Sequence, residues 1–182
     1  FLNRRLETHK VKLLVDLYDS IKEESVISFD KTQISADVIN ELNQNVDLND
    51  KFISMPDKIV ADIEDFTDIN GYKDESSTLY LDTMVSIITE TNFNNENDFI
   101  SEKIFKPLWH MQPFIVLGRP HMLKYLKEIG FKTFDWLIDE SYDSVEDNEL
   151  RMEMVKIEIL KLKDYTIDEL KHNRFYAFYH QQ

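Results

Sequence analysis

Several residue types are scarce in this chain of 182 residues, and each scarcity excludes a kind of chemistry. Cysteine is absent, which excludes disulfides and thiolate chemistry. Only three glycines occur, and no P-loop, Gly-x-Gly-x-x-Gly or Gly-x-Ser-x-Gly sequence is found, which disfavours P-loop NTPases, typical dinucleotide oxidoreductases and serine hydrolases. No apolar run approaches the ~18 residues of a membrane span and no stretch reads as a signal peptide, so we expect a cytoplasmic protein.

Positive charge is scarce as well. The chain has 21 Lys and Arg residues against 35 Asp and Glu residues, a formal net charge of −14. The summed field repels phosphate, so we expect no nonspecific binding to nucleic acid or to anionic membranes. The five histidines show no metal-ligand spacing, and we predict no metal site. A hydrophobic content of 42% is enough for a buried core, and the length fits one domain.

The positive charge that is present gathers in one stretch, residues 100–127. The stretch has a single acid, Glu102, and its basic residues are Lys103, Lys106, Arg119, Lys124 and Lys127. It also contains three of the four prolines and one of the three glycines, namely Pro107, Pro113, Pro120 and Gly118. Such a local concentration of charge and turns within an acidic chain favours a pocket for a small anion.

Hydrophobic spacing predicts the helices and strands. In the first part of the chain we expect a helix within residues 3–22 with Thr8 as its N-cap, a strand at residues 25–29 and a helix at residues 34–42. Residues 44–78 hold nine acids, three lysines and few periodic runs, so we predict an irregular acidic segment there.

From residue 80 onward, strands and helices alternate. The predicted elements are a strand at residues 84–91, a helix capped by Ser101, a strand at 113–118, a helix at 119–130 with Pro120 in its first turn and Gly130 as its C-terminal cap, a strand at 132–134, a helix at 148–163 and a helix capped by Thr166. This order predicts an α/β fold, a Rossmann-like parallel sheet flanked by helices. We expect one such lobe over residues 1–182. Because the chain opens on Phe1 rather than Met, we also expect a fragment of a longer protein.

Two strand-to-helix junctions in this region predict a phosphate site. Ligands of open α/β sheets lie outside the carboxyl ends of the strands, and helix N-termini favour anions. One junction leads to the helix start at Lys103, and the other is the turn at Gly118 and Arg119, where glycine would let a ligand approach the backbone. Glu90, at a strand end, and His121, at a helix start, are further candidates.

Other residues have an ordinary structural interpretation. We expect Phe105 and Trp109 in the core, although Trp109 could instead stack on a base. We expect Lys106 in solvent, Pro107 at a helix kink, and residues 139–147 in a solvated acidic connection. The apolar side of the helix at residues 148–163 is predicted to comprise Leu150, Met154, Ile157 and Leu160 to Leu162.

The order Ser-Glu-Lys at residues 101–103, followed by Gln-Pro-Phe-Ile-Val-Leu-Gly at residues 112–118, resembles the donor-binding signature of α-1,3-fucosyltransferases. In that family a Thr-Glu-Lys-like helix start precedes a Pro-led strand that ends in Gly, and two Rossmann-like lobes form the GT-B arrangement. The resemblance implies that this chain is the C-terminal, donor-binding lobe. Glu102 would then accept hydrogen bonds from sugar hydroxyls, and Lys103 would neutralise a phosphate of a GDP-sugar.

Longer segments resemble a group of glycosyltransferase-like proteins of phages, large viruses and marine bacteria. These segments include IITET, ISEKIFKPL and QPFIVLGRPHMLKYLKEIGFKTFDWLIDESYD, and together they span most of residues 1–162 outside the acidic segment. The resemblance implies that the first helix also faces the donor. Arg4 or Arg5, with His9 and Lys10, would then approach the diphosphate.

Two functions follow as hypotheses. The first is the donor-binding half of an inverting, metal-independent glycosyltransferase. It would need no cofactor beyond a nucleotide-diphosphate sugar and would act on an unknown acceptor glycan or protein. Its partners would be an N-terminal lobe, which would supply the general base, or other protein chains. The second is a noncatalytic binding or assembly module of a larger protein, for example a viral one.

Overall fold

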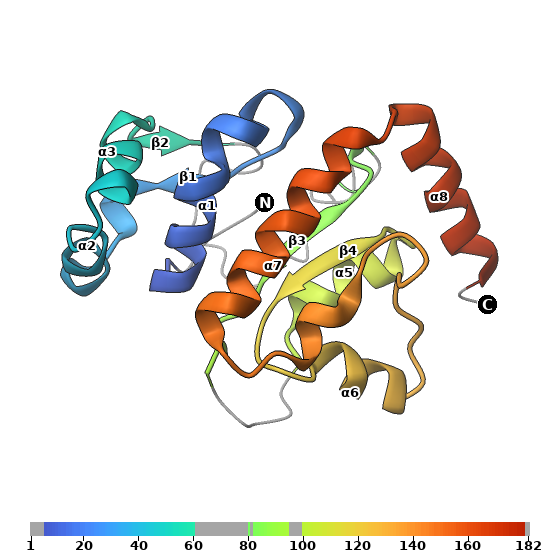
Figure 1. Cartoon of the computed structure of the whole chain (residues 1–182). Coiled ribbons are helices and arrows are strands. Elements are labelled where there is room, and N and C mark those ends of the chain that lie inside the picture. Colours follow the sequence, from blue (N-terminus) through green and yellow to red (C-terminus); the bar gives the residue numbers. More distant parts are fainter. Residues whose placement is uncertain (1–5, 61–79, 81, 95–99, 181–182) are drawn as a thin grey trace. The chain divides into compact units, whose positions relative to one another are not determined.

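The computed structural model describes residues 6–60, 80, 82–94 and 100–180, in two compact units, Phe1–Leu79 and Tyr80–Gln182 (Figure 1). The fold class is mixed α/β, as predicted. The alternation of strands and helices belongs to the second unit, whereas the described part of the first unit is largely helical. One Rossmann-like lobe over the whole chain stays a prediction.

In its described residues, 6–60, the first unit packs three α-helices beside a short antiparallel strand pair. Its elements are α1 (Thr8–Ile21), η1 (Lys22–Glu24), β1 (Phe29–Asp30), η2 (Lys31–Gln33), α2 (Ala36–Leu42), α3 (Val46–Ser54) and β2 (Lys58–Ile59). The helix predicted over residues 34–42 is therefore confirmed as α2. Thr8 is the first residue of α1 and not its N-cap, which is Glu7.

The acidic segment at residues 44–78 is more regular than predicted in its described part. Asn45 caps α3 by accepting the Leu48 N–H at 3.1 Å, and β2 follows and pairs with β1. The strand predicted at residues 25–29 is wrong in extent, because β1 consists of Phe29 and Asp30 alone. α3 depends on its N-cap, and β1 and β2 depend on pairing with each other. Hydrophobic spacing predicts neither feature.

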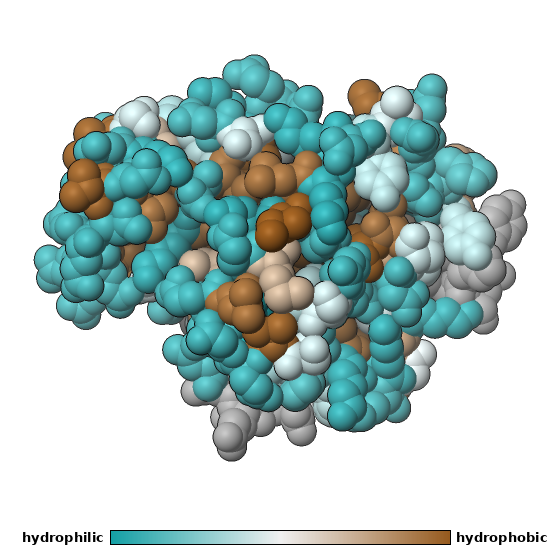
Figure 2. Space-filling model, viewed as in Figure 1, coloured by the Kyte–Doolittle hydropathy of each residue, from teal (hydrophilic) through white to brown (hydrophobic). Residues whose placement is uncertain are grey.

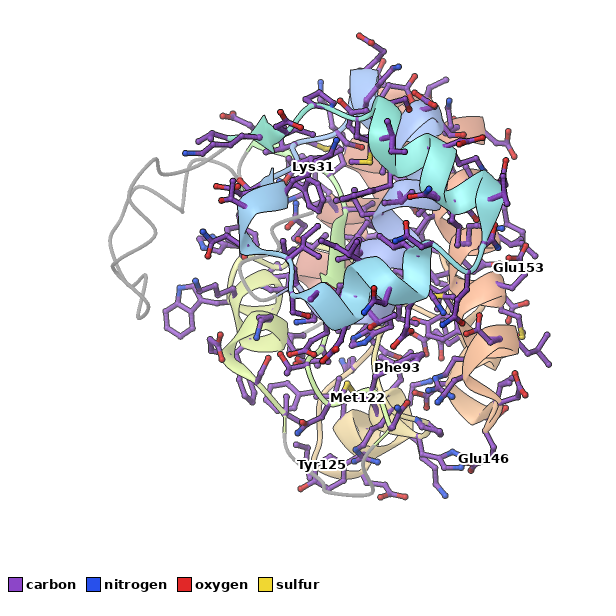
Figure 3. The ribbon with its side chains drawn as sticks, turned by 90° about the vertical axis from the view of Figure 1, so that its left-hand side faces the viewer. Lys31, Phe93, Met122, Tyr125, Glu146 and Glu153 are labelled. Carbon is purple, nitrogen blue, oxygen red and sulfur yellow. The ribbon has the colours of Figure 1, made fainter. Side chains whose placement is uncertain are left out.

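Lys31 stabilises the end of α3. Its Nζ donates to the Met55 carbonyl at 2.6 Å and lies 3.4 Å from the Ile53 carbonyl, and it also sits 4.9 Å from the ring centroid of Phe52. Figure 3 shows Lys31 beside the C-terminal end of α3. A cation at this end of a helix opposes the partial negative charge of the free carbonyls.

The second unit is built on a parallel strand pair. Its elements are β3 (Ser86–Thr89), α5 (Glu102–Trp109), β4 (Phe114–Leu117), α6 (Met122–Glu128), η3 (Glu140–Ser144), α7 (Asn148–Lys161), η4 (Leu162–Asp164) and α8 (Ile167–His180). β3 and β4 pair in parallel, from Ser86 opposite Phe114 to Thr89 opposite Leu117. All four residues of β4 are buried, as expected of a continuous apolar run. α5 and α7 lie on opposite sides of the pair (Figures 1 and 3).

Two helix ends form as the sequence predicts. Ser101 is the N-cap of α5, and Thr166 and Glu169 bond reciprocally at the start of α8. Gly130 follows α6 with φ of 99°. In this conformation the N–H groups of Gly130 and Phe131 donate to the carbonyls of Lys127 and Leu126. Pro120, by contrast, lies outside α6, because His121 is the N-cap.

Predictions about a strand, about the buried face of α5 and about the buried face of α7 are wrong. Residues 132–134 form no strand. Trp109 and Phe105 are exposed, at 85% and 42%, because α5 buries Ile104 and Leu108 against the strand pair instead. The helix face of α7 is also different from the one predicted.

α7 buries a stripe that carries charge. The buried positions are Arg151, Val155, Glu158 and Ile159, whereas Leu150 and Ile157 are exposed. Figure 2 shows hydrophobic side chains among hydrophilic ones along α7. The charged side chains are buried because they find hydrogen-bond partners, and Glu158, for example, accepts the Asp139 N–H at 3.1 Å.

Candidate functional site at the carboxyl ends of β3 and β4

The parallel register brings the two predicted junctions to one edge of the strand pair. Glu90 follows β3 and Gly118 follows β4 directly. The Glu90 N–H donates to the Leu117 carbonyl at 2.9 Å, and a Cβ at Gly118 would lie 3.5 Å from the Glu90 Cβ. Two candidates that lie 28 positions apart in the sequence are thus neighbours in the fold.

The first junction is organised around a buried carboxylate. Glu90 accepts the Ser101 hydroxyl at 2.5 Å, and both residues are buried. The Ser101 Oγ in turn accepts the Lys103 N–H at 3.2 Å and lies 3.5 Å from the Lys103 Nζ. Glu90, Ser101 and Lys103 therefore form one polar cluster at the start of α5.

Glu102 lies at the outer side of this cluster. Its side chain is 57% exposed, and its Oε1 lies 3.4 Å from the Lys103 Nζ. Partial burial acts to raise the pKa of Glu102, but its own backbone N–H and Lys103 outweigh that effect, so the pKa lies below its ordinary value. Glu102 is therefore an ionised acceptor that solvent or a ligand hydroxyl can reach.

The second junction is closely packed. A Cβ at Gly118 would lie 2.8 Å from the Met122 Sδ, so the glycine makes room for a side chain of the protein itself. Arg119 is buried, donates to the Pro120 carbonyl at 3.1 Å and lies 5.7 Å from the ring centroid of Tyr125. Figure 3 labels Met122 and Tyr125, which both belong to α6.

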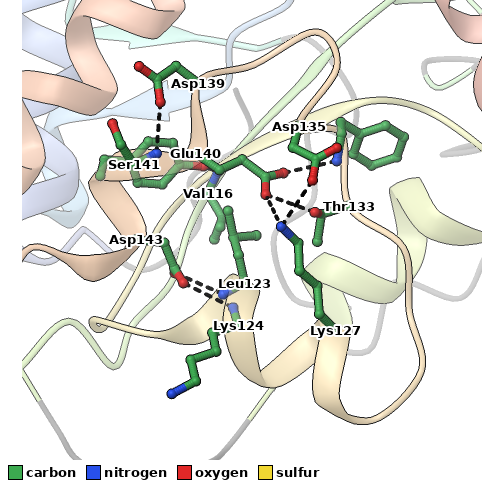
Figure 4. Close-up of polar contacts among 12 residues, drawn as sticks. Val116, Leu123, Lys124, Lys127, Thr133, Asp135, Asp139, Glu140, Ser141 and Asp143 are labelled. Carbon is green, nitrogen blue, oxygen red and sulfur yellow. Dashed lines mark hydrogen bonds and ion pairs between the residues drawn. The ribbon is translucent and has the colours of Figure 1, made fainter.

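The start of α6 already holds an anion of the chain. The two carboxylate oxygens of Asp143 accept the Leu123 and Lys124 N–H groups at 2.8 and 2.9 Å (Figure 4). The Asp143 carbonyl also accepts the His121 N–H at 2.6 Å. The N–H groups that we expected to bind a phosphate therefore bind a carboxylate. His121 adopts φ of 61°, and its Nε2 lies 3.1 Å from Glu146 Oε1.

The acidic connection at residues 139–147 is solvated in part, since Asp139, Glu146 and Asp147 are exposed as predicted, whereas Glu140 and Asp143 bind neighbouring parts of the second unit. Glu140 accepts from Thr133 Oγ1 at 2.8 Å and from the Phe134 N–H at 2.9 Å, and it pairs with Lys127 at 2.9 Å (Figure 4). Tyr142 is buried beside β4, and burial raises the pKa of its hydroxyl. Glu140 and Asp143 are therefore used for structure.

The site contains one residue that the sequence interpretation missed, Arg151 of α7. Its guanidinium is buried, and its donors reach the Gly118 carbonyl at 3.0 Å and the Phe93 carbonyl at 3.1 Å. These carbonyls follow β4 and β3, so Arg151 joins both strand ends. Arg151, Val155 and Glu158 are spaced so that they lie on one side of the helix, and this spacing is the signal that could have predicted the burial of Arg151.

The remaining predicted donor residues belong to the first unit. His9 and Lys10 lie on α1 and are buried there, while Arg5 lies outside the described residues. Their approach to a diphosphate stays a prediction.

Neither a metal site, nor a membrane span, nor a known relative adds to this description of the site. Among the residues that the structure describes, no group of three or more histidine, aspartate or glutamate side chains could hold a metal ion. No helix in the same described ranges is long and apolar enough to cross a bilayer. No match to the chain was found among protein-family models, curated proteins or solved structures.

Proposed function

We propose that the second unit is a Rossmann-like, donor-binding half of a GT-B glycosyltransferase. It would bind a nucleotide-diphosphate sugar, with a GDP-sugar favoured, for transfer of the sugar to an acceptor hydroxyl without a metal ion. The observation that carries the proposal is the cluster of Glu90, Ser101 and Lys103. It joins the Ser-Glu-Lys helix start of the resembled signature to the end of a parallel strand, where ligands of open α/β sheets bind.

Each residue of the cluster has a chemical task in this proposal. Lys103, whose side chain is 37% exposed, neutralises a phosphate, and the exposed carboxylate of Glu102 accepts hydrogen bonds from sugar hydroxyls. Glu90 holds Ser101, and through it the first turn of α5, in place. Positive groups near the leaving diphosphate stabilise the charge that develops on it during transfer. Gly118, Arg119 and His121 remain candidates at the second junction.

The N–H groups at the starts of α5 and α6 contribute less to phosphate binding than their position at the strand ends suggests. At α6, Asp143 takes the free N–H groups. At α5, Ser101 takes the Lys103 N–H. We therefore assign the phosphate to the side chain of Lys103 and its neighbours rather than to a helix dipole. No residue of this chain is assigned as the general base, which would come from an N-terminal lobe or another protein chain.

The test is calorimetric titration of the chain with GDP-, UDP- and ADP-sugars, in wild type, Lys103→Ala and Lys106→Ala. Lys106 is the matched control, because it is the same residue type three positions further along α5. We expect Lys103→Ala to weaken binding at least tenfold and Lys106→Ala to leave it nearly unchanged, because one charge-assisted contact is worth about 1.5–3 kcal/mol. Absence of binding to wild type, or equal affinity of the two variants, would falsify the proposal.

A noncatalytic binding or assembly module is the second candidate. It is favoured by Trp109, whose 85% exposure is high for so large an aromatic side chain. In this alternative a partner chain covers Trp109, and the strand-end cluster is structural. Covering Trp109 would shift its fluorescence to shorter wavelength in the assembled protein, and Trp109→Phe would abolish that shift. An unshifted spectrum in the assembly would argue against this candidate.

A further inference from the structure

Arg151 is a buried charge held by neutral groups. Besides Gly118 and Phe93, its guanidinium donates to the Val145 carbonyl at 2.7 Å, to the Glu146 carbonyl at 3.2 Å and to the Asn148 Oδ1 at 2.5 Å. The five N–H donors of an arginine are thereby used, and the acceptors are backbone carbonyls and one amide. The Phe93 ring centroid lies 4.7 Å from the Arg151 Cζ.

No carboxylate forms an ion pair with Arg151 in the part of the chain that the structure describes. Burial lowers the pKa of Arg151, and Glu146, Asp143 and Asp147 act against this from beyond ion-pair distance. Arginine stays protonated in proteins even so. The carbonyls satisfy its hydrogen bonds, but they leave a full positive charge inside the protein that is only partly compensated.

The position of this charge gives it a use. The Gly118 carbonyl ends one strand and the Phe93 carbonyl follows the other, so the guanidinium lies between the two strand ends that frame the candidate site. A buried charge is screened by solvent and salt less than an exposed one, so its field can reach an anion bound at these strand ends. Its hydrogen bonds are occupied, so it would act on a ligand through space.

We propose that Arg151 supplies the buried positive charge of an anion site at the carboxyl ends of β3 and β4, and thereby favours the diphosphate of the donor. This inference deepens the proposed function and rests on it. Arg151 is a positioning residue in this scheme, since it holds both junctions by their carbonyls and need not touch the ligand. Lys103 makes the direct contact.

The alternative is that Arg151 only ties the two loops together. The two roles separate in Asn148→Asp, which replaces the amide oxygen 2.5 Å from Arg151 by a carboxylate of the same shape. The substitution keeps the hydrogen bonds by which Arg151 joins the two loops and neutralises the charge of its guanidinium. Asn148 opens α7, where an acid suits the helix dipole, and Asn94, which accepts the Asn148 amide at 2.5 Å, can turn its own amide to donate instead.

The experiment is calorimetric titration of the whole chain with inorganic pyrophosphate at low salt, in wild type, Asn148→Asp and Lys163→Gln. Lys163→Gln is the control, because it makes the same change in net charge at an exposed position of η4. For Asn148→Asp we expect about tenfold weaker binding, the scale of one charge acting across a partly screened distance, with an unchanged or higher urea midpoint. Lys163→Gln should bind within twofold of wild type.

Several outcomes would overturn the inference. These are a wild-type chain that does not bind pyrophosphate, an Asn148→Asp variant that binds as tightly as wild type, or equal losses in both variants. Arg151→Lys and Arg151→Met give a second comparison, in which the inference requires the charged variant to bind pyrophosphate more tightly. Pyrophosphate binding without nucleotide-sugar binding would refute the proposed function and leave this inference standing. Nucleotide-sugar binding by Asn148→Asp that is as tight as in wild type would refute this inference and leave the proposed function standing.

Discussion

Removal of the Asp143 carboxylate should destabilise the second unit strongly. The side chain is buried, and its two oxygens accept the Leu123 and Lys124 N–H groups at the start of α6. In Asp143→Ala both N–H groups lose this acceptor. Asp143→Asn keeps the shape and one acceptor oxygen, but loses the charge that suits the helix N-terminus.

The magnitude follows from these contacts. A hydrogen bond to a charged group contributes about 1.5–3 kcal/mol, and loss of a single N-cap costs about 0.5–2 kcal/mol. The two bonds share one carboxylate and do not add fully, so we expect Asp143→Ala to lower the free energy of unfolding by about 3 kcal/mol. Asp143→Asn should cost about half of that. With a urea m-value of about 1.5 kcal/mol per M, the midpoint falls by about 2 M and 1 M.

The assay is urea denaturation followed by tryptophan fluorescence. Trp136 is a suitable reporter, because its ring lies between Phe134 and Tyr176 in the second unit. Asp139→Asn is the control, since Asp139 is an exposed acid of the same segment that caps one N–H, that of Ser141. The reasoning is refuted if Asp143→Ala shifts the midpoint no more than this control does.

Three further predictions concern stability. Gly130→Ala should cost about 1 kcal/mol because of its positive φ, and Met111→Gly, at φ of 51° in the equivalent turn after α5, should gain a few tenths of a kcal/mol; both are measured as urea midpoints. Burial, aided by Arg174, lowers the pKa of His110 below 6.5, so the folded state resists its protonation and stability should fall as pH drops below 6.5; a wild-type pH profile no steeper than that of His110→Gln would refute this. Lys31→Met should cost about 1–2 kcal/mol by freeing the carbonyls at the end of α3, seen as faster amide exchange in that helix, whereas unchanged exchange would exclude the cap.

The features that could be predicted from the sequence are those that neighbouring residues decide. Ser101 caps α5 because its hydroxyl reaches a backbone N–H two residues away. Gly130 ends α6 because a positive φ costs little without a side chain. The strand at Phe114–Leu117 follows from four consecutive apolar residues, and such runs favour burial on both faces.

Tertiary contacts decide what could not be predicted. Asp143 caps a helix start 19 and 20 residues before it, so residues 139–147 read as a solvated acidic run although Asp143 is buried. Trp109 has the same apolar character as Ile104, and spacing on a helix of only eight residues does not show which side faces the strands. Arg151 can be buried because carbonyls 33 and 58 residues away accept hydrogen bonds from its guanidinium.

Those sequence separations also have a consequence for how the second unit forms. Until Arg151 is available, the carbonyls of Phe93 and Gly118 lack the donors that they have in the native structure. Contacts between residues distant in the sequence form more slowly than local ones. During synthesis the chain would therefore carry β3 and β4 with unfinished ends until α7 leaves the ribosome. Closure of this edge should then be a late folding step, with low φ-values at Arg151 and its main effect on the unfolding rate.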